Sequence, residues 1–214
     1  MYGAKANGRW SPVNEVEMDE RGDRDEIARP PLLRTAAIFY ALMFAAALVW
    51  GAVEGRVPVF ASAESAARGV RWGVDPGIGL AAGLLIVGLS DVVTRATRWG
   101  DRTARMLAEV IGPVRTGNAV ALALLSSVAE ELLFRGALQP HLGLVGTSLL
   151  FGLAHLAPRR ALLPWTGMAV AAGFLLGGLF LATGNLAAPV VAHFVVNAVN
   201  LRALSRRYLE SPGA

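Results

Sequence analysis

The sequence AVALALLSSVAEELLFR (residues 119–135) places Glu130, Glu131 and Arg135 in the middle of an otherwise apolar run. A charged side chain at the centre of a membrane helix costs about 2.5–3.5 kcal/mol on insertion scales. Chains that keep such charges usually need them for ion pathways, proton transfer or catalysis. We therefore expect this segment to lie in a membrane and to carry chemistry there.

The composition favours a membrane protein over a soluble one. Of 214 residues, 54% are hydrophobic and 17% are charged, whereas soluble domains carry about 25% charged residues. The chain has no cysteine, which excludes disulfides, thiol catalysis and cysteine-ligated zinc or iron–sulfur clusters. Its 20 Lys and Arg residues flank the apolar runs, so they indicate membrane topology rather than binding to nucleic acid.

The apolar runs predict an all-α, polytopic membrane helix bundle of about six transmembrane helices. We interpret residues 1–31 as a disordered cytoplasmic tail, residues 32–204 as the membrane-embedded domain and residues 205–214 as a short C-terminal tail. Gly173 and Gly177 form a G-x-x-x-G motif that suits close helix packing. The expected spans are 35–53, 76–93, 118–136, 139–157, 161–183 and 187–204.

Residues 103–114 lie between the second and third spans and have their apolar side chains on one helical face. This pattern predicts an interfacial amphipathic helix, with an ordinary surface helix as the alternative. The positive charges predict the orientation of the whole bundle. If both termini are cytoplasmic, the opposite side receives only Arg56, Arg68 and Arg71, in agreement with the positive-inside rule.

Helical spacing gives the two glutamates different roles. Glu131 and Arg135 are four residues apart and share a face, so we expect a structural ion pair. Glu130 is rotated by about 100° from Glu131 and cannot share that pair equally well. It is therefore left as a free, desolvated carboxyl, which suits a group that takes up and returns protons.

Two histidines and an asparagine in the later spans could complete a site. A turn at His141 would bring Glu130 and His155 level, about 18 Å from the turn. His193 and Asn197 project together from the last span, but His193 lies only about 9 Å from its start. A tilted helix or a later helix start must therefore close the gap. A carboxylate, a proton-relaying histidine and a His/Asn donor pair would suffice for amide hydrolysis.

Other interpretations of these charges stay open. They could staple the helices of a non-catalytic immunity or scaffold protein, or they could belong to a proton-coupled transporter. The sequence has no His-Glu-x-x-His motif and no Gly-x-Ser-x-Gly motif. Two histidines and a glutamate could hold zinc, but we expect no cofactor.

At these residues the sequence resembles a known family. The segment 130–138 (EELLFRGAL), Phe151-x-x-x-His155 and His193-x-x-x-Asn197 match the three signature motifs of the CPBP family. That family includes the CAAX prenyl proteases of the Rce1 type and the Abi, or bacteriocin-processing, proteins. The resemblance covers about 118–204. It implies a glutamic-type intramembrane endopeptidase in which Glu130 and His155 activate water and His193 and Asn197 form the oxyanion site.

The segment 164–197 is similar to the myxosortase branch of that family, whose members are thought to cleave C-terminal sorting tails of exported proteins. The resemblance implies a multi-pass protein of the bacterial cytoplasmic (inner) membrane. Its expected partners are membrane lipids and a membrane-associated protein substrate with a C-terminal processing signal, and not nucleic acid.

Overall fold

The computed structural model describes residues 30–55, 69–157 and 159–210, and this part of the chain is all-α, as predicted. Residues 1–29 of the predicted tail lie outside the described residues. The helices are α2 (Pro30–Val53), α3 (Asp75–Ala96), α4 (Arg98–Ile111), α5 (Thr116–Glu131), the π-helical η1 (Leu132–Leu138), α6 (Gln139–Ala154), the 3₁₀-helical η2 (Arg160–Leu162), α7 (Leu163–Thr183) and α8 (Ala187–Tyr208).

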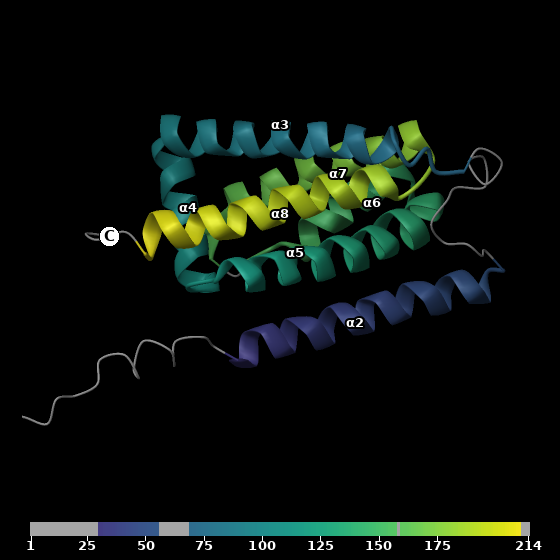
Figure 1. Ribbon diagram of the computed structural model, residues 1–214, viewed down its shortest axis with the longest axis horizontal. Coiled ribbons are helices and arrows are strands. Elements are labelled where there is room, and N and C mark those ends of the chain that lie inside the picture. The colour runs from purple at the N-terminus through teal and green to yellow at the C-terminus, as the bar shows by residue number, and fades with distance from the viewer. Residues whose placement is uncertain (1–29, 56–68, 158, 211–214) are drawn as a thin grey trace, which may run out of the picture.

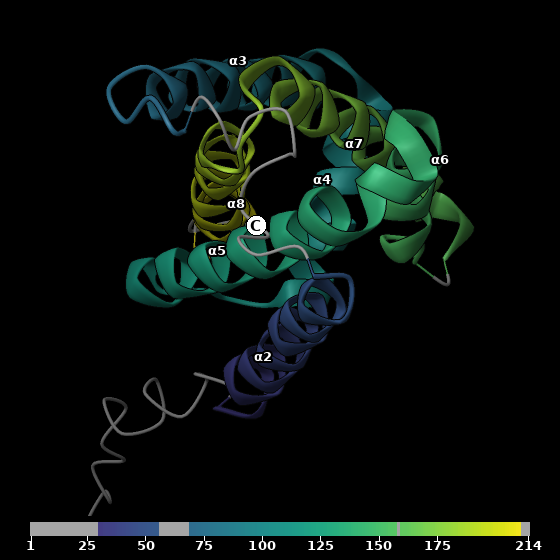
Figure 2. The same cartoon turned by 90° about the vertical axis from the view of Figure 1, so that its right-hand side faces the viewer.

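The long helices run along a common axis, and α4 crosses them at one end (Figure 1). Helix α8 lies between α3 and α5, while α2 packs on the far side of α5 (Figure 2). The start of α2 and the end of α8 lie at the end of the bundle where α4 is found (Figure 1). Within the described residues, five helical runs are long and apolar enough to cross a membrane.

The sequence predicted about six spans because it counted 118–136 and 139–157 as two. Both fall in one run of 39 residues, Thr116–Ala154. A straight helix would hold Glu130 and His155 about 37 Å apart, yet His155 Nε2 lies 3.7 Å from Glu130 Oε2. The chain therefore folds back, at Gly143, whose φ of 66° and ψ of 177° interrupt α6. Glycine adopts such a positive φ without strain, and this turn lies two residues from the predicted one.

Small residues allow the central helices to approach closely. A Cβ atom added to Gly79 of α3 would lie 2.3 Å from the carbonyl oxygen of Ala188 on α8. On α7, a Cβ atom at Gly177 would lie 2.5 Å from Leu144 Cδ1 of α6. The predicted packing role of the G-x-x-x-G motif is thus confirmed. Since hydrophobic burial cannot drive helix association inside lipid, such close contacts carry much of the stability.

The end of the bundle at α4 differs from the prediction in its helix boundaries. Helix α4 begins at Arg98 rather than at residue 103, and Gly112 ends it with a φ of 77°. Helix α8 continues to Tyr208, so residues 205–208 of the predicted tail are helical. Tyr208 donates a 2.8 Å hydrogen bond to Asp101 of α4, which anchors this extension and, together with Arg105, holds the pKa of the Asp101 carboxyl below its usual value.

A polar cluster at the opposite end of the bundle fixes the start of α3. Asn185 Nδ2, in the α7–α8 turn, donates to the fully buried Asp75 Oδ2 at 2.8 Å. The same carboxylate accepts hydrogen bonds from the backbone and the guanidinium of Arg71. Asn185 Oδ1 in turn accepts from the backbone N–H of Ala187, in the first turn of α8. This cluster sets the level of α8 relative to α3.

Gly79→Ala should destabilise the bundle by about 1–3 kcal/mol, because the new methyl group overpacks the α3–α8 contact. Gly88→Ala on the same helix is the matched control, since a Cβ atom there would meet nothing within 4 Å. Unfolding in mixed micelles with increasing dodecyl sulfate measures both free energies. Equal stability of the two variants would contradict the close α3–α8 contact.

Candidate active site

The candidate residues come from four elements, α5, η1, α6 and α8. Glu130 and Glu131 end α5, and Arg135 lies in the π-helix η1. His155 caps the C-terminus of α6, and His193 and Asn197 lie on α8. The structure brings all six side chains to the middle of the bundle, where Glu130, Glu131, Arg135 and His193 are buried. π-Helical turns occur often at functional sites, and nothing in the sequence predicted this one.

Glu131 and Arg135 form a fully buried ion pair. Arg135 Nη1 donates to Glu131 Oε1 at 3.2 Å, and neither side chain is exposed. Arg135 Nη2 also donates to the backbone carbonyl of Gly173 at 3.1 Å, and its guanidinium lies 4.6 Å from the centre of the Phe151 ring. The glycine of α7 therefore serves twice: it permits close packing, and it leaves its carbonyl open to the arginine.

His193 belongs to this ion-pair network as well as to the cavity beside it. Its Nδ1 lies 2.7 Å from Glu131 Oε1. A carboxylate in an ion pair with arginine accepts hydrogen bonds, so Nδ1 carries a proton and donates it. Only Nε2 is then left to contact a substrate. The sequence predicted His193 as an oxyanion donor but did not predict that Glu131 holds its other nitrogen.

Glu130 and His155 form a second, separate pair. Their Oε2 and Nε2 atoms are 3.7 Å apart. His155 Nδ1 lies 2.8 Å from the carbonyl oxygen of Phe151, and since a carbonyl only accepts, Nδ1 carries the proton. In the neutral ring the lone pair of Nε2 therefore faces Glu130. Within the described part of the chain, Glu130 Oε2 is buried and has no hydrogen-bond partner.

Asn197 is oriented by a serine on the neighbouring helix. Its Nδ2 donates to Ser126 Oγ at 2.9 Å, and Ser126 Oγ donates to the carbonyl of Ala123 at 3.2 Å. One hydrogen of the Asn197 amide remains available. Tyr40, on α2, lies close to Glu130 and Ser126 and interacts with both. Helix α2 thus contributes to a site that the sequence assigned to the later helices alone.

The predicted difference in depth between His193 and the glutamates of α5 is absent when both are measured from the α4 end of the bundle. Helices α5 and α8 are antiparallel and meet where Val114 N–H donates to Ser205 Oγ at 3.0 Å. Glu131 lies 15 residues after the start of α5, and His193 lies 15 residues before the end of α8. Both are therefore about 22 Å from the shared end. The expected tilt or later start of the last helix is not needed.

Aromatic side chains fix the imidazole of His155. Its ring lies 4.5 Å from the Phe151 ring and 5.9 Å from the Trp165 ring, centre to centre. Thr166 Oγ1 donates to the backbone carbonyl of His155 at 3.4 Å. Trp165 had no separate role in the sequence prediction. Tyr40, the one tyrosine of the 35–53 span, was a polar signal that sequence reasoning missed.

The site opens into a cavity lined by His155, His193 and Asn197 together with Trp165 and Met168. Polar atoms from α6 and α8 thus face one space of mainly apolar walls, as is typical of ligand sites. Within the described residues, no three His, Asp or Glu side chains are grouped so that they could hold a metal ion.

Comparisons with known proteins match the part of the chain that contains these residues. Residues 113–199 match the family model described as type II CAAX prenyl endopeptidase Rce1-like. Over 84 residues the chain is 46% identical to the uncharacterized protein YpbD of Bacillus subtilis (strain 168), which covers 38% of this chain and 43% of that protein. The chain therefore matches less than half the length of this relative. No solved structure matches the chain.

The segment 113–199 is similar to the Rce1-like endopeptidases, in agreement with the resemblance of its three motifs to the CPBP family. The match includes all three motifs, from Glu130 to Asn197, and its family is one of proteases. With its five apolar runs, the protein is a multi-pass membrane protein. The resemblance to the myxosortase branch stays a prediction.

Arg135→Ala should lower the free energy of unfolding by about 3–5 kcal/mol, because it leaves Glu131 as an uncompensated buried charge. Glu130→Gln should change it little, since Glu130 is not the partner of Arg135. Thermal unfolding of both variants in the same detergent measures the difference. Equal loss of stability in the two variants would contradict the division into two separate pairs.

Proposed function

We propose that this protein is an intramembrane endopeptidase in which Glu130 and His155 activate a water molecule. The observation that carries the proposal is the buried Glu130 Oε2, which has no hydrogen-bond partner in the described residues and faces His155 Nε2 across 3.7 Å. A water molecule beside these two atoms can donate one hydrogen to each of them. Both acceptors then act on one nucleophile, as general base catalysis requires.

The remaining groups fit the later steps of amide hydrolysis. Glu130 takes a proton as the water oxygen attacks the carbonyl carbon of the substrate. The carbonyl oxygen becomes an oxyanion, which accepts hydrogen bonds from the free N–H of Asn197 and from His193 Nε2 in its protonated form. The Glu131 carboxylate at 2.7 Å stabilises that imidazolium. When the C–N bond breaks, Glu130 returns its proton to the leaving amine.

Preorganisation supports these roles. Each donor or acceptor has a partner that fixes it: Phe151 O for His155, Glu131 for His193 and Ser126 for Asn197. The oxyanion donors are therefore held in place before the charge develops, which is the arrangement in which hydrogen bonds lower a barrier most. The mainly apolar cavity also excludes competing water.

The substrate class and the location follow from the family and from charge. Members related to CAAX proteases would act near a C-terminal segment, of the CAAX or sorting type, in a membrane-associated protein. The excess of arginine at the α4 end of the bundle supports a bacterial inner-membrane protein with both termini in the cytoplasm. The site would then lie about 22 Å from the cytoplasmic end of the helices.

A non-catalytic immunity or scaffold protein is the alternative of a different class. The Arg135–Glu131–His193 network supports this alternative in part. It connects η1, α7 and α8, as a purely structural cluster would. A scaffold, however, needs no second buried carboxylate whose one oxygen lacks a hydrogen bond and faces a histidine, since burying an unpaired polar atom lowers stability. Glu130 therefore favours catalysis.

Glu130→Gln should reduce peptide cleavage by at least about 100-fold, the lower end of what general acid–base groups contribute. The assay uses purified protein in liposomes with a synthetic peptide library that carries an N-terminal acyl chain and varied C-terminal residues. Mass spectrometry detects the products. Glu109→Gln, at an exposed position of α4, is the matched control and should cleave like the wild type.

Cleavage at the wild-type rate by folded Glu130→Gln protein would refute the mechanism. A second arm tests the zinc alternative. Treatment with o-phenanthroline followed by dialysis should leave the rate unchanged, because the proposed chemistry uses no metal. Loss of activity that only added zinc restores would favour a metal site instead.

A further inference from the structure

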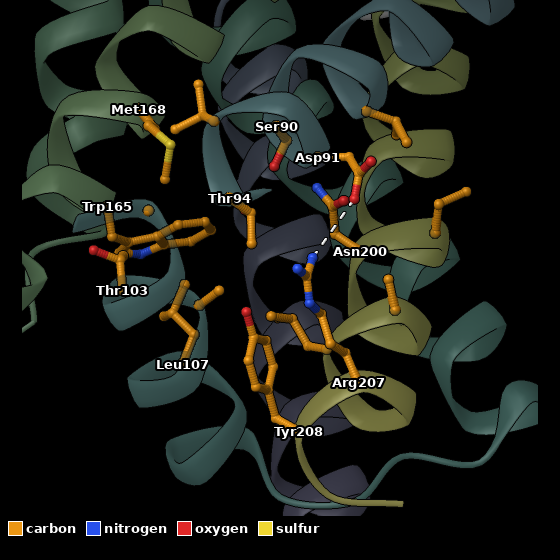
Figure 3. Close-up of a pocket in the computed structure, with 17 residues that line it drawn as sticks. Ser90, Asp91, Thr94, Thr103, Leu107, Trp165, Met168, Asn200, Arg207 and Tyr208 are labelled. Carbon is orange, nitrogen blue, oxygen red and sulfur yellow. Dashed lines mark ion pairs between the residues drawn. The ribbon is translucent and has the colours of Figure 1, made fainter. Parts of the chain in front are cut away.

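A second cavity adjoins the active site at the α4 end of the bundle. It lies between α3, α4, α7 and α8 and encloses about 830 Å³ of empty space, including its open mouth. Figure 3 shows its side chains: Ser90 and Met168 lie at one end, and Arg207 and Tyr208 at the other. We call this cavity the α4 pocket. The proposed reaction does not use it.

The α4 pocket adjoins the catalytic cavity. Four residues line both spaces, namely Ser90, Trp165, Met168 and Asn200. Trp165 also packs against the ring of His155. Asn200 lies three residues beyond Asn197 on α8. A chain bound in both spaces would contact these four residues.

Two polar side chains at this junction make no hydrogen bond within the described residues. Neither the side chain of Ser90 nor that of Asn200 has a hydrogen-bond partner among residues 30–55, 69–157 and 159–210. Most other polar side chains of the bundle interior do have one. A hydroxyl and an amide that face a cavity in this way match the N–H and C=O groups of an extended peptide.

The walls of the pocket favour an uncharged side chain. Its charged groups lie at the rim and largely satisfy one another: Asp91 accepts hydrogen bonds of 2.8 and 2.7 Å from Arg95 and lies 3.7 Å from Arg207. A buried charge on the ligand would find no free partner there, and burying it would be unfavourable. The remaining walls are mainly apolar and include Val87, Leu107, Met168, Val199, Ala203 and Leu204.

We propose that the α4 pocket binds an uncharged apolar side chain of the substrate, on a residue within about three positions of the scissile bond. Ala203 lies six residues beyond Asn197 on α8, or about 9 Å along the axis, which is the length of about three extended residues. Ser90 and Asn200 bind the intervening backbone. This inference rests on the proposed function and specifies which substrates the site accepts.

The absence of cysteine from the chain permits a direct test. In Ala203→Cys, methyl or benzyl methanethiosulfonate attaches a small or a large group inside the pocket. Ala96→Cys places the same groups at an exposed position of α3 that does not line the pocket, and is the matched control. The acylated peptide library then reports which residues are accepted at each position near the cut.

The benzyl adduct on residue 203 should reduce cleavage of peptides with a large apolar residue at one position at least about tenfold. Peptides with a small residue there should be affected less, and the methyl adduct should have the smaller effect. An unchanged residue preference, or a uniform loss across all peptides, would overturn the inference. So would the same change in preference with the adduct on residue 96.

Binding is measured separately in a Glu130→Gln background, so that the pocket and the catalytic mechanism are tested apart. Immobilised Glu130→Gln/Ala203→Cys protein should retain peptides with the large apolar residue, and the benzyl adduct should release them. Retention that the adduct does not change would overturn the pocket. The wild type could fail to cleave any peptide while the immobilised variant still retains peptides and the benzyl adduct releases them. That result would refute the proposed function but not the pocket.

Discussion

The buried pair of Glu131 and Arg135 is the interaction on which the rest of the structure depends. Neither side chain is exposed, so each charge must be compensated inside the protein. The arginine reaches the Gly173 carbonyl on α7, and the glutamate holds His193 on α8. Loss of either partner would strand a charge at a cost of about 3–5 kcal/mol. One ion pair thus fixes the relative positions of three segments and orients a histidine towards the catalytic cavity.

The adjacent Glu130 can differ from Glu131 because this compensation is already complete. It faces His155 across a chain that folds back at Gly143, and the described structure gives its Oε2 no hydrogen bond. Two neighbouring carboxylates therefore have different environments, which is the usual way in which one site provides both a structural charge and a proton acceptor. Two adjoining cavities lie beside them.

Local spacing predicted much of this arrangement. The i,i+4 positions of Glu131 and Arg135 and the nearly equal distances of Glu130 and His155 from the turn are properties of a helix and a hairpin. Contacts between distant segments were not predictable in this way. The Tyr40 contact, the Glu131–His193 hydrogen bond and the π-helix depend on how α2, α5 and α8 pack. The boundary at Tyr208 depends on Asp101 of α4, since the polar sequence of residues 205–208 resembles a tail.

The central claim is that Glu130 and His155 act on one water molecule as a unit. A double-mutant cycle tests it most directly, with cleavage rates of Glu130→Ala, His155→Ala and the double variant measured per folded molecule in liposomes. Groups that act as a unit are strongly non-additive, so the double variant should be about as slow as the slower single variant. Rate losses that multiply, with each residue contributing independently, would contradict the account.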